Sequence, residues 1–319
     1  MGKTLPNIVT DGPTVNGNHP SGDDWTIGAL LRGNVGWASG TTTVQKPPRT
    51  LPRLEVSMLL AHVLSCRRES LIAHPERVLS RVESAAFVDL VRQRLDGTPI
   101  AYLTRSREFY GILLEIDPSV LIPRPETELL VDAALQRLSR RSKVTILDLG
   151  TGSGAIAIAL ATNLPDALIE AVDRSDAALD VARRNVARHR LTSVDVHAAD
   201  WYSGVRSAAF DVIVSNPPYV REEDPHLDEG DVRFEPRQAL TAGRDGLAAI
   251  RTIAAGAPSR LKDGGTLLVE HGHDQGDACR EIFIVAGLTD VETLRDLAGH
   301  DRVCVGSLSK IGQAEHSIR

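Results

Sequence analysis

Short hydrophobic runs alternate with amphipathic stretches through the second half of the chain. The runs, rich in Val, Ile, Leu and Ala, lie at 144–149, 168–173, 194–198, 211–215 and 266–270. Runs of this length and composition are typical of strands buried in a parallel sheet. Apolar residues between them recur at helical spacing, as at 129–138, 155–162 and 246–261. This alternation predicts an α/β fold with a mostly parallel sheet, to which residues 291–309 can add two closing strands.

The first part of the chain has a different pattern. Between Leu51 and Leu95 apolar residues follow helical spacing, which predicts a small helical bundle. Residues 107–116 alternate and are followed by Asp117-Pro118, which predicts a β-hairpin. Residues 1–50 are rich in Gly, Thr, Asn and Pro, so we expect a mostly disordered leader, although residues 25–31 could form one helical turn.

These patterns divide the chain into four parts. They are a disordered leader at 1–50, a helical domain at 51–104, a hairpin linker at 105–122 and an α/β domain at 123–310. The helical domain is too small for a large core of its own. It either recognises a partner or acts as a stabilising cap on the main domain.

Composition and charge exclude several classes of protein. The net charge of −6 argues against a general nucleic-acid binder, whose affinity comes from a basic surface. The three cysteines are far apart, so neither a metal site nor a disulfide framework is expected, and a reducing compartment is the default. No apolar run is long enough to span a membrane, and no targeting signal is evident, so we expect a cytoplasmic protein.

The stretch Asn216-Pro217-Pro218-Tyr219 follows the run at 211–215. Two prolines end a strand, so these residues lie at its carboxyl end, where open α/β sheets place their ligands. The Asn216 side-chain oxygen and a proline carbonyl are two acceptors on stiff backbone, and they can hold both hydrogens of a planar NH2 group. Tyr219 offers an aromatic face to that group. The alternative is a simple Pro-Pro turn that caps a strand.

A glycine turn, Gly150-Thr151-Gly152-Ser153-Gly154, follows the run at 144–149 and precedes a helix of small residues. Glycines allow a ligand to approach the backbone, and the helix N-terminus lies next to it. The next run ends in Asp173, about twenty residues after the glycines, where a carboxylate can accept hydrogen bonds from ribose hydroxyls. Strand, turn, helix, strand and acid together indicate an adenosine-type ligand.

Several further residues have two readings. Asp200 could accept from an adenine amino group while Trp201 packs on or near the base, and interdomain packing is a credible alternative for Trp201. Arg124, between two prolines, could steer a carboxylate or a partner chain, or it could be a solvated linker charge. His271 ends the run at 266–270, where a structural histidine is favoured over a general base.

The two motifs together decide between adenosine cofactors. A dehydrogenase would carry the glycine turn and the acid, but it would not need an amide-gripping Asn-Pro-Pro-Tyr. With S-adenosylmethionine both features have a use, because a methyl donor must be held against a nitrogen lone pair. Neither a metal nor a covalent nucleophile is required.

Between about Leu51 and Val305 the chain resembles the N5-glutamine methyltransferases of peptide chain release factors. The segments that carry the resemblance are Arg107-Glu108-Phe109-Tyr110-Gly111, Leu121-Ile122-Pro123-Arg124-Pro125-Glu126-Thr127-Glu128, Asp148-Leu149 with the glycine turn, Asn216-Pro217-Pro218-Tyr219, Gly230-Asp231-Val232-Arg233-Phe234-Glu235-Pro236 and Glu270-His271-Gly272. The chain departs from the family at Arg105, where glycine is usual, and in the leader.

The resemblance implies a Rossmann-like class I S-adenosylmethionine-dependent methyltransferase with a seven-stranded, mostly parallel sheet and a small N-terminal helical domain that helps to bind the release factor. It implies methylation of the glutamine of a Gly-Gly-Gln motif. By position, the implied cofactor contacts are Gly150, Thr151, Gly152, Ser153, Gly154, Asp173, Trp201 and Asn216, and the implied glutamine-holding residues are Asn216, Pro217, Pro218 and Tyr219.

Two other functions remain open at this point. A nucleic-acid methyltransferase acting on adenine N6 or cytosine N4 could use the same motif on a flipped base, although the acidic balance counts against it. A non-catalytic adaptor could keep the fold in order to bind release factors, but it would not need the glycine turn, Asp173 and Asn216 together. For the enzyme, whose substrate is itself a large protein, we expect a monomer with no direct nucleic-acid contact and no membrane association.

Overall fold

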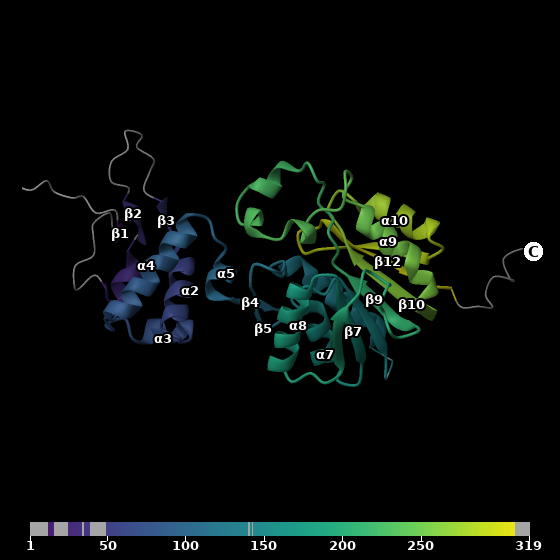
Figure 1. Cartoon of the computed structure of the whole chain (residues 1–319), viewed down its shortest axis with the longest axis horizontal. Helices are drawn as coiled ribbons and strands as arrows, with labels where there is room; N and C mark the ends of the chain where they lie inside the picture. The colour runs from purple at the N-terminus through teal and green to yellow at the C-terminus, as the bar shows by residue number, and fades with distance from the viewer. Residues whose placement is uncertain are drawn as a thin grey trace, which may run out of the picture. The chain divides into compact units, whose positions relative to one another are not determined.

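The computed structural model describes residues 12–15, 25–33, 35–38, 49–139, 141 and 143–309. The chain divides into two compact units, Met1–Arg105 and Ser106–Arg319. Both units are drawn in Figure 1, where the first runs from purple to blue and the second from teal to yellow.

The first unit is built mainly from helices. Its elements are β1 (Gly12–Val15), α1 (Ile27–Arg32), β2 (Val35–Ala38), β3 (Arg49–Thr50), α2 (Arg53–Val63), α3 (Arg68–Ala73), α4 (Arg81–Leu95) and α5 (Ile100–Thr104). Helix α4 begins at a capping box, in which the Ser80 hydroxyl accepts from the Glu83 amide and the Glu83 carboxylate accepts from the Ser80 amide. The expected helical domain is therefore present between residues 51 and 104.

The expectation of a disordered leader up to residue 50 is wrong for part of that segment. Helix α1 buries Ile27, Leu30 and Leu31 in the same core as Leu59 of α2 and Phe87 of α4. The Thr26 hydroxyl caps the helix by accepting from the Ala29 amide at 3.2 Å. The apolar residues of this short segment stabilise a helix because they pack against the hydrophobic surfaces of α2 and α4. The structure does not describe the other residues of the predicted leader, so the prediction for them lies outside the described part of the chain.

The second unit is an α/β domain. Its elements are β4 (Ser106–Phe109), β5 (Ile112–Glu115), the 3₁₀ turn η2 (Pro125–Thr127), α6 (Glu128–Leu138), β6 (Thr145–Leu149), α7 (Ala155–Asn163), β7 (Leu168–Asp173), α8 (Asp176–Arg188), β8 (Val194–Ala198), β9 (Phe210–Ser215), α9 (Ala248–Gly256), β10 (Leu261–Glu270), α10 (Gly276–Val285), β11 (Thr289–Arg295) and β12 (Asp301–Ser307). Strands β4 and β5 form an antiparallel hairpin within the expected linker region.

The sheet has seven strands in the order β11-β12-β10-β9-β6-β7-β8. Strand β12 is antiparallel to both of its neighbours, and the other pairings are parallel. The predicted mostly parallel, Rossmann-like sheet is confirmed. From β6 the chain builds outward on one side through β7 and β8, then returns to place β9 on the other side. The order reverses between β6 and β9, the position at which such sheets form their ligand crevice.

Helices cover both faces of this sheet. Helices α9 and α10 pack on one face, where Ile250, Ile253 and Phe283 join Leu147 of β6 and Ile213 of β9 in one core. Helix α7 is buried along most of its length and contacts β7, β8, α6 and α8. In Figure 1 the strands of the larger unit lie between α7 and α8 below and α9 and α10 above. This leaves the carboxyl ends of the strands free for a site.

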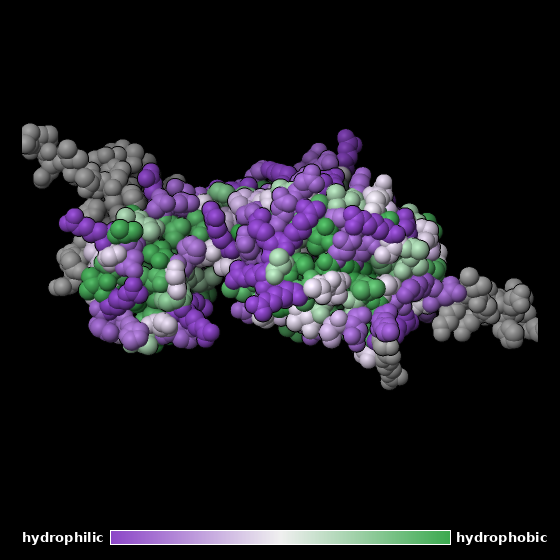
Figure 2. All heavy atoms as spheres, turned by 60° about the horizontal axis from the view of Figure 1, so that its bottom comes forward, coloured by the Kyte–Doolittle hydropathy of each residue, from purple (hydrophilic) through white to green (hydrophobic). Residues whose placement is uncertain are grey.

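The face of the molecule drawn in Figure 2 carries both hydrophilic and hydrophobic side chains. On the face shown in Figure 2, hydrophilic side chains surround smaller hydrophobic areas. Large hydrophobic side chains exposed on the first unit include Ile72, Val78 and Val82. Among the described residues, no helix has the length and hydrophobicity needed to cross a membrane.

Candidate active site

The glycine turn lies where the sheet order reverses. Gly150, Gly152 and Gly154 have φ angles of 71°, 55° and 83°, a left-handed conformation that strains any residue with a Cβ. These angles bend the chain sharply from the end of β6 into α7, which begins at Ala155. The backbone conformation therefore favours glycine at all three positions.

Asp173 closes the turn from the neighbouring strand. One carboxylate oxygen accepts from the Gly152 amide at 3.0 Å and the other from the Ser175 amide at 2.9 Å. These bonds hold the carboxylate at the carboxyl end of β7, half-buried beside the glycines. Each oxygen keeps a lone pair that a ligand hydroxyl can use.

A second carboxyl group lies beneath the turn. Asp148, in β6, is fully buried, and its Oδ2 accepts from the Thr151 hydroxyl at 2.7 Å. Burial raises the pKa of Asp148 to about 7, and the nearby negative charge of Asp173 acts in the same direction. The sequence pattern alone assigns Asp148 no role, whereas in the structure its carboxyl group fixes the orientation of the Thr151 side chain.

A cavity of about 330 Å³ opens above these residues. Its walls include most of the residues expected to contact a cofactor, namely Gly150, Thr151, Gly152, Ser153, Asp173, Trp201 and Asn216, as well as Asp200 and Pro218. Gly154 does not line it. A Cβ built on Gly154 would lie 3.2 Å from Ile158 Cδ1, so this glycine serves helix packing.

The residues present fit an adenosine-type cofactor. A Cβ built on Gly152 would meet no protein atom within 4 Å, so the turn faces open space where a ligand can approach the backbone. The cavity falls within the range of about 300–1,000 Å³ that is typical of small-molecule sites. Asp173 supplies acceptors for ribose hydroxyls, and half-buried Trp201 adds an aromatic wall within the same unit.

The Asn-Pro-Pro-Tyr stretch lies directly after β9 and separates this cavity from a second one of about 260 Å³. Asn216 lines both cavities, Pro218 lines the larger one, and Pro217 and Tyr219 line the smaller one. The structure therefore places the first acceptor of the proposed amide grip at the boundary between two spaces. Sequence reasoning had put all four residues in one site, which the structure divides.

The stretch is held from behind at several points. The side-chain nitrogen Nδ2 of Asn216 donates to the Thr127 hydroxyl at 3.0 Å, and the Tyr219 hydroxyl donates to Glu270 Oε1 at 3.2 Å. Gln275 donates to the Tyr219 carbonyl at 3.0 Å. Burial and the neighbouring Glu270 raise the pKa of Tyr219, so its hydroxyl is a hydrogen-bond donor rather than a base.

Arg124 belongs to an internal ion pair. Its guanidinium donates to Glu235 Oε1 at 2.5 Å, while Glu235 Oε2 accepts from the Ile122 amide at 3.1 Å. Glu235 is buried, and its burial raises the pKa of its carboxyl above the usual range. The pair fastens the segment after Asp231 to the linker before α6. Because Arg124 also lines the smaller cavity, it shapes that wall as well.

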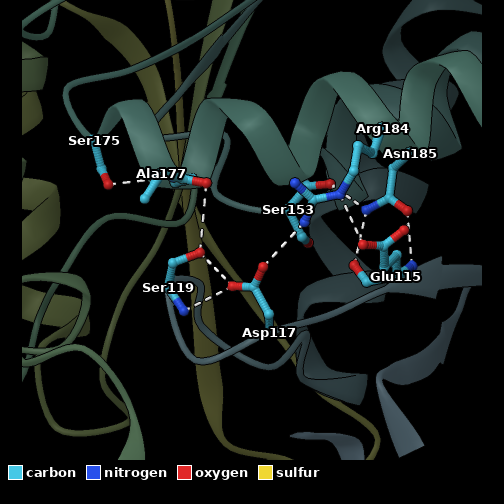
Figure 3. A network of polar contacts seen from close by, with 9 residues as sticks. Glu115, Asp117, Ser119, Ser153, Ser175, Ala177, Arg184 and Asn185 are labelled. Atoms are coloured by element: carbon cyan, nitrogen blue, oxygen red, sulfur yellow. Dashed lines mark hydrogen bonds and ion pairs between the residues drawn. The ribbon is translucent and has the colours of Figure 1, made fainter.

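Asn185, on α8, ties the hairpin to the glycine turn (Figure 3). It is fully buried; its Oδ1 accepts from the Glu115 amide at 2.7 Å, and its Nδ2 donates to the carbonyls of Glu115 and Ser153, both at 2.9 Å. Arg184 beside it forms ion pairs with Glu115 and Asp117. Sequence reasoning missed Asn185, because nothing in a helix of ordinary pattern marks one asparagine as buried.

His271 lies away from both cavities. It is fully buried, and its Nδ1 is 2.8 Å from the Gly272 carbonyl oxygen, which makes this nitrogen the protonated one. Burial lowers the pKa of His271, so the ring is kept neutral. This geometry favours a structural histidine. Among the described residues, no group of three or more His, Cys, Asp or Glu side chains could hold a metal ion.

Two family models and several curated relatives match the chain. Residues 126–231 match the family described as "Methyltransferase small domain", and residues 45–104 match "PrmC N-terminal domain". The chain is 48% identical over 256 residues to the release factor glutamine methyltransferase of Xylella fastidiosa (strain Temecula1), covering 80% of this chain and 93% of the relative. It is 46% identical over 255 residues to that of Escherichia coli K12, covering 80% and 92%.

The chain belongs to the release factor glutamine methyltransferase family. A solved structure, that of the release factor-specific protein-(glutamine-N5) methyltransferase from Alicyclobacillus acidocaldarius, is 31% identical, with coverage of 61% of this chain and 99% of that chain and a TM-score of 0.38. The identity to the curated relatives confirms the family resemblance inferred from the motifs.

The departure at Arg105 has a structural meaning. Arg105 follows α5 with a φ of 52° and a ψ of 30°, the left-handed conformation that ends many helices. Glycine adopts this conformation without a Cβ clash, which explains why glycine suits this position in the family. In this chain an arginine occupies that conformation.

Proposed function

We propose that this protein transfers a methyl group from S-adenosylmethionine to the side-chain amide nitrogen (N5) of the glutamine in the Gly-Gly-Gln motif of peptide chain release factors. The observation that carries the proposal is the position of Asn216, which lines both the larger cavity and the smaller one. A residue there can contact a cofactor on one side and an acceptor amide on the other.

The larger cavity would hold the cofactor. The turn Gly150–Ser153 offers backbone close to the ligand, Asp173 accepts from the ribose hydroxyls, and Trp201 covers the adenosine side. When bound, S-adenosylmethionine supplies an electrophilic methyl group on a sulfonium. The protein contributes the position of that group and the exclusion of water around it.

The smaller cavity would hold the glutamine side chain. Asn216 Oδ1 and the Pro217 carbonyl accept one hydrogen each from the substrate NH2, and Tyr219 provides an apolar wall. An amide lone pair is delocalised, so the nitrogen is a poor nucleophile. Acceptors placed for a more pyramidal nitrogen stabilise the transition state more than the ground state.

The partner is a protein, and the first unit would take part in its recognition. That unit matches the N-terminal domain of the family and exposes Ile72, Val78 and Val82 on its surface. We expect the enzyme to act as a monomer in the cytoplasm, without direct contact with nucleic acid.

The charge around the smaller cavity supports a protein acceptor over DNA. Residues 221–231 contain six acidic residues and one arginine, and Asp224 from this segment lines the cavity. Such a segment repels phosphates, whereas nucleic-acid methyltransferases need a positive surface near the flipped base. A non-catalytic adaptor is disfavoured because a pure binding protein has no use for an amide grip that opens onto the cofactor cavity.

The proposal is tested by supplying labelled S-adenosylmethionine with a purified release factor, the same factor with Gln→Ala in its Gly-Gly-Gln motif, and duplex DNA. We expect label on the unmodified factor alone. Label on DNA would favour the nucleic-acid enzyme, and cofactor binding without transfer to any acceptor would favour the adaptor.

A further inference from the structure

A hydroxyl group behind the Asn-Pro-Pro-Tyr stretch has no role in the function proposed so far. Thr127 ends η2, immediately before α6, and only 3% of it is exposed. Its Oγ1 lies 3.0 Å from the side-chain nitrogen Nδ2 of Asn216. The carboxamide of Asn216 has one donor end and one acceptor end, and the proposed grip needs the acceptor end to face the substrate.

The groups around Thr127 determine whether its hydroxyl contacts the donor end or the acceptor end of the Asn216 carboxamide. A threonine hydroxyl has one proton to donate and lone pairs to accept with. The Thr127 hydroxyl also lies beside the carboxyl group of Glu270, where it acts to lower the pKa of that group. Glu270 Oε1 accepts from Tyr219, while Oε2 is fully buried and has no hydrogen-bond partner among the described residues. When its carboxyl group is ionised, at a pH above its raised pKa of about 7, Glu270 is therefore the acceptor available for the Thr127 proton.

We infer that Thr127 is a positioning residue that sets the orientation of the Asn216 carboxamide. With its proton directed to Glu270, the Thr127 oxygen accepts from Asn216 Nδ2 and leaves Oδ1 for the substrate NH2. A reversed carboxamide would present a donor to a donor and could not hold the glutamine amide. This inference rests on the proposed function and adds to it the residue that keeps the grip in its working orientation.

Two substitutions separate this role from simple packing. Thr127→Val keeps the shape but removes the hydroxyl, whereas Thr127→Ser keeps the hydroxyl and removes the methyl. A positioning role predicts that Thr127→Val lowers kcat about 100-fold, as expected for a misplaced reacting group, and that Thr127→Ser restores most of it. A packing role predicts the reverse order, because valine fills the space and serine leaves a gap.

The assay measures kcat and KM with the release factor and, separately, the Kd for S-adenosylmethionine. Thr127 also lines the larger cavity, so the Kd is needed to detect a direct cofactor contact. We expect the loss in kcat, with the cofactor Kd changed little. Thr266→Val is the matched control, because Thr266 is a similarly buried threonine in β10 whose hydroxyl faces Ser307 at 3.4 Å.

Each outcome is informative. Normal kcat in Thr127→Val, low kcat in Thr127→Ser, or a loss confined to the cofactor Kd would overturn the positioning role while leaving the proposed function intact. Failure of the wild-type enzyme to methylate the factor would instead overturn the proposed function. If Thr127→Val does not fold, the comparison of Thr127→Ala with Thr127→Ser serves the same purpose, since only serine restores the hydroxyl.

Discussion

Replacing Glu270 with glutamine should remove part of the pH dependence of folding stability. Glu270 ends β10, is fully buried and accepts from the Tyr219 hydroxyl. Burial is the main cause that raises the pKa of its carboxyl from 4.5 to about 7, against the opposing effects of the Thr127 hydroxyl, Arg302 and Tyr219. The folded protein therefore holds this proton at a pH where the unfolded chain releases it.

The sign and size of the effect follow from linkage. Because the folded-state pKa is the higher one, the stabilisation is complete below pH 4.5 and is lost as the pH rises to about 7. The difference between the two pKa values corresponds to about 3 kcal/mol in the free energy of unfolding. A glutamine cannot ionise, so the variant should gain about 3 kcal/mol relative to wild type between pH 4.5 and pH 8.

Other groups titrate in the same window, so only the comparison with wild type isolates Glu270. The raised pKa of Asp148 acts in the same direction. The lowered pKa of His271 acts in the opposite one, because its stabilisation is present above its unfolded pKa and is lost as the pH falls. Asp245→Asn is the control. Its partner Arg251 lowers the Asp245 pKa to about 2, which places its titration below this window.

The assay is urea unfolding of both proteins at several pH values between 4.5 and 8. The chain has three tryptophans, of which Trp25 and Trp37 lie in the first unit. In a background with both replaced by phenylalanine, Trp201 reports on the unit that contains Glu270. A constant difference between wild type and Glu270→Gln across this range would refute the reasoning, as would a variant that loses relative stability as the pH rises.

Three further predictions concern the site and the linker. Asn216→Ala should lower kcat at least about 100-fold while changing the Kd for S-adenosylmethionine little, since it removes an acceptor that acts mainly in the transition state; near-normal turnover in a single-turnover assay would contradict the amide grip. Asp173→Ala should weaken cofactor binding about 10- to 100-fold by calorimetry, because hydrogen bonds to a charged group are lost; an unchanged Kd would exclude its ribose role. Arg105→Gly should raise the free energy of unfolding of the first unit by up to about 1 kcal/mol, because glycine adopts the left-handed φ of 52° without strain; a lower melting temperature would count against this.

The central parts of the fold and site could be predicted because their signals are local. The turn at Gly150–Gly154 and the stretch from Asn216 to Tyr219 each directly follow a hydrophobic run, and both lie at strand ends of the sheet as expected. In such cases the residue types and the neighbouring strand together fix the position along the chain.

The supporting residues could not be predicted, because their partners are distant in sequence. Thr127 and Asn216 are 89 residues apart, and Arg124 and Glu235 are 111 residues apart. Asn185 reaches Glu115 and the glycine turn only once α8 has packed beside the sheet. From the sequence, helix α1 could be expected only as one possible helical turn, because its short apolar face gains a packing role only against the helices that cover it.

The division of the site into two cavities could not be predicted from the sequence either, because it depends on the three-dimensional structure. The sequence placed Asn216, Pro217, Pro218 and Tyr219 together, and they are adjacent in the chain. In the folded chain Pro218 lines the larger cavity, Pro217 and Tyr219 line the smaller one, and Asn216 lines both. Sequence spacing left open whether Arg124 is a solvated linker charge or contacts a carboxylate. In the structure Arg124 forms an ion pair with the buried carboxylate of Glu235.

The most direct test of the account is the site of the methyl group on the product. A release factor treated with the enzyme and S-adenosylmethionine is digested, and the peptides are sequenced by mass spectrometry. The account predicts one added methyl group on the side-chain amide nitrogen of the glutamine in the Gly-Gly-Gln motif, formed at least about 100-fold more slowly when wild-type enzyme is replaced by Asn216→Ala. A methyl group on any other residue, or equal modification by Asn216→Ala, would contradict it.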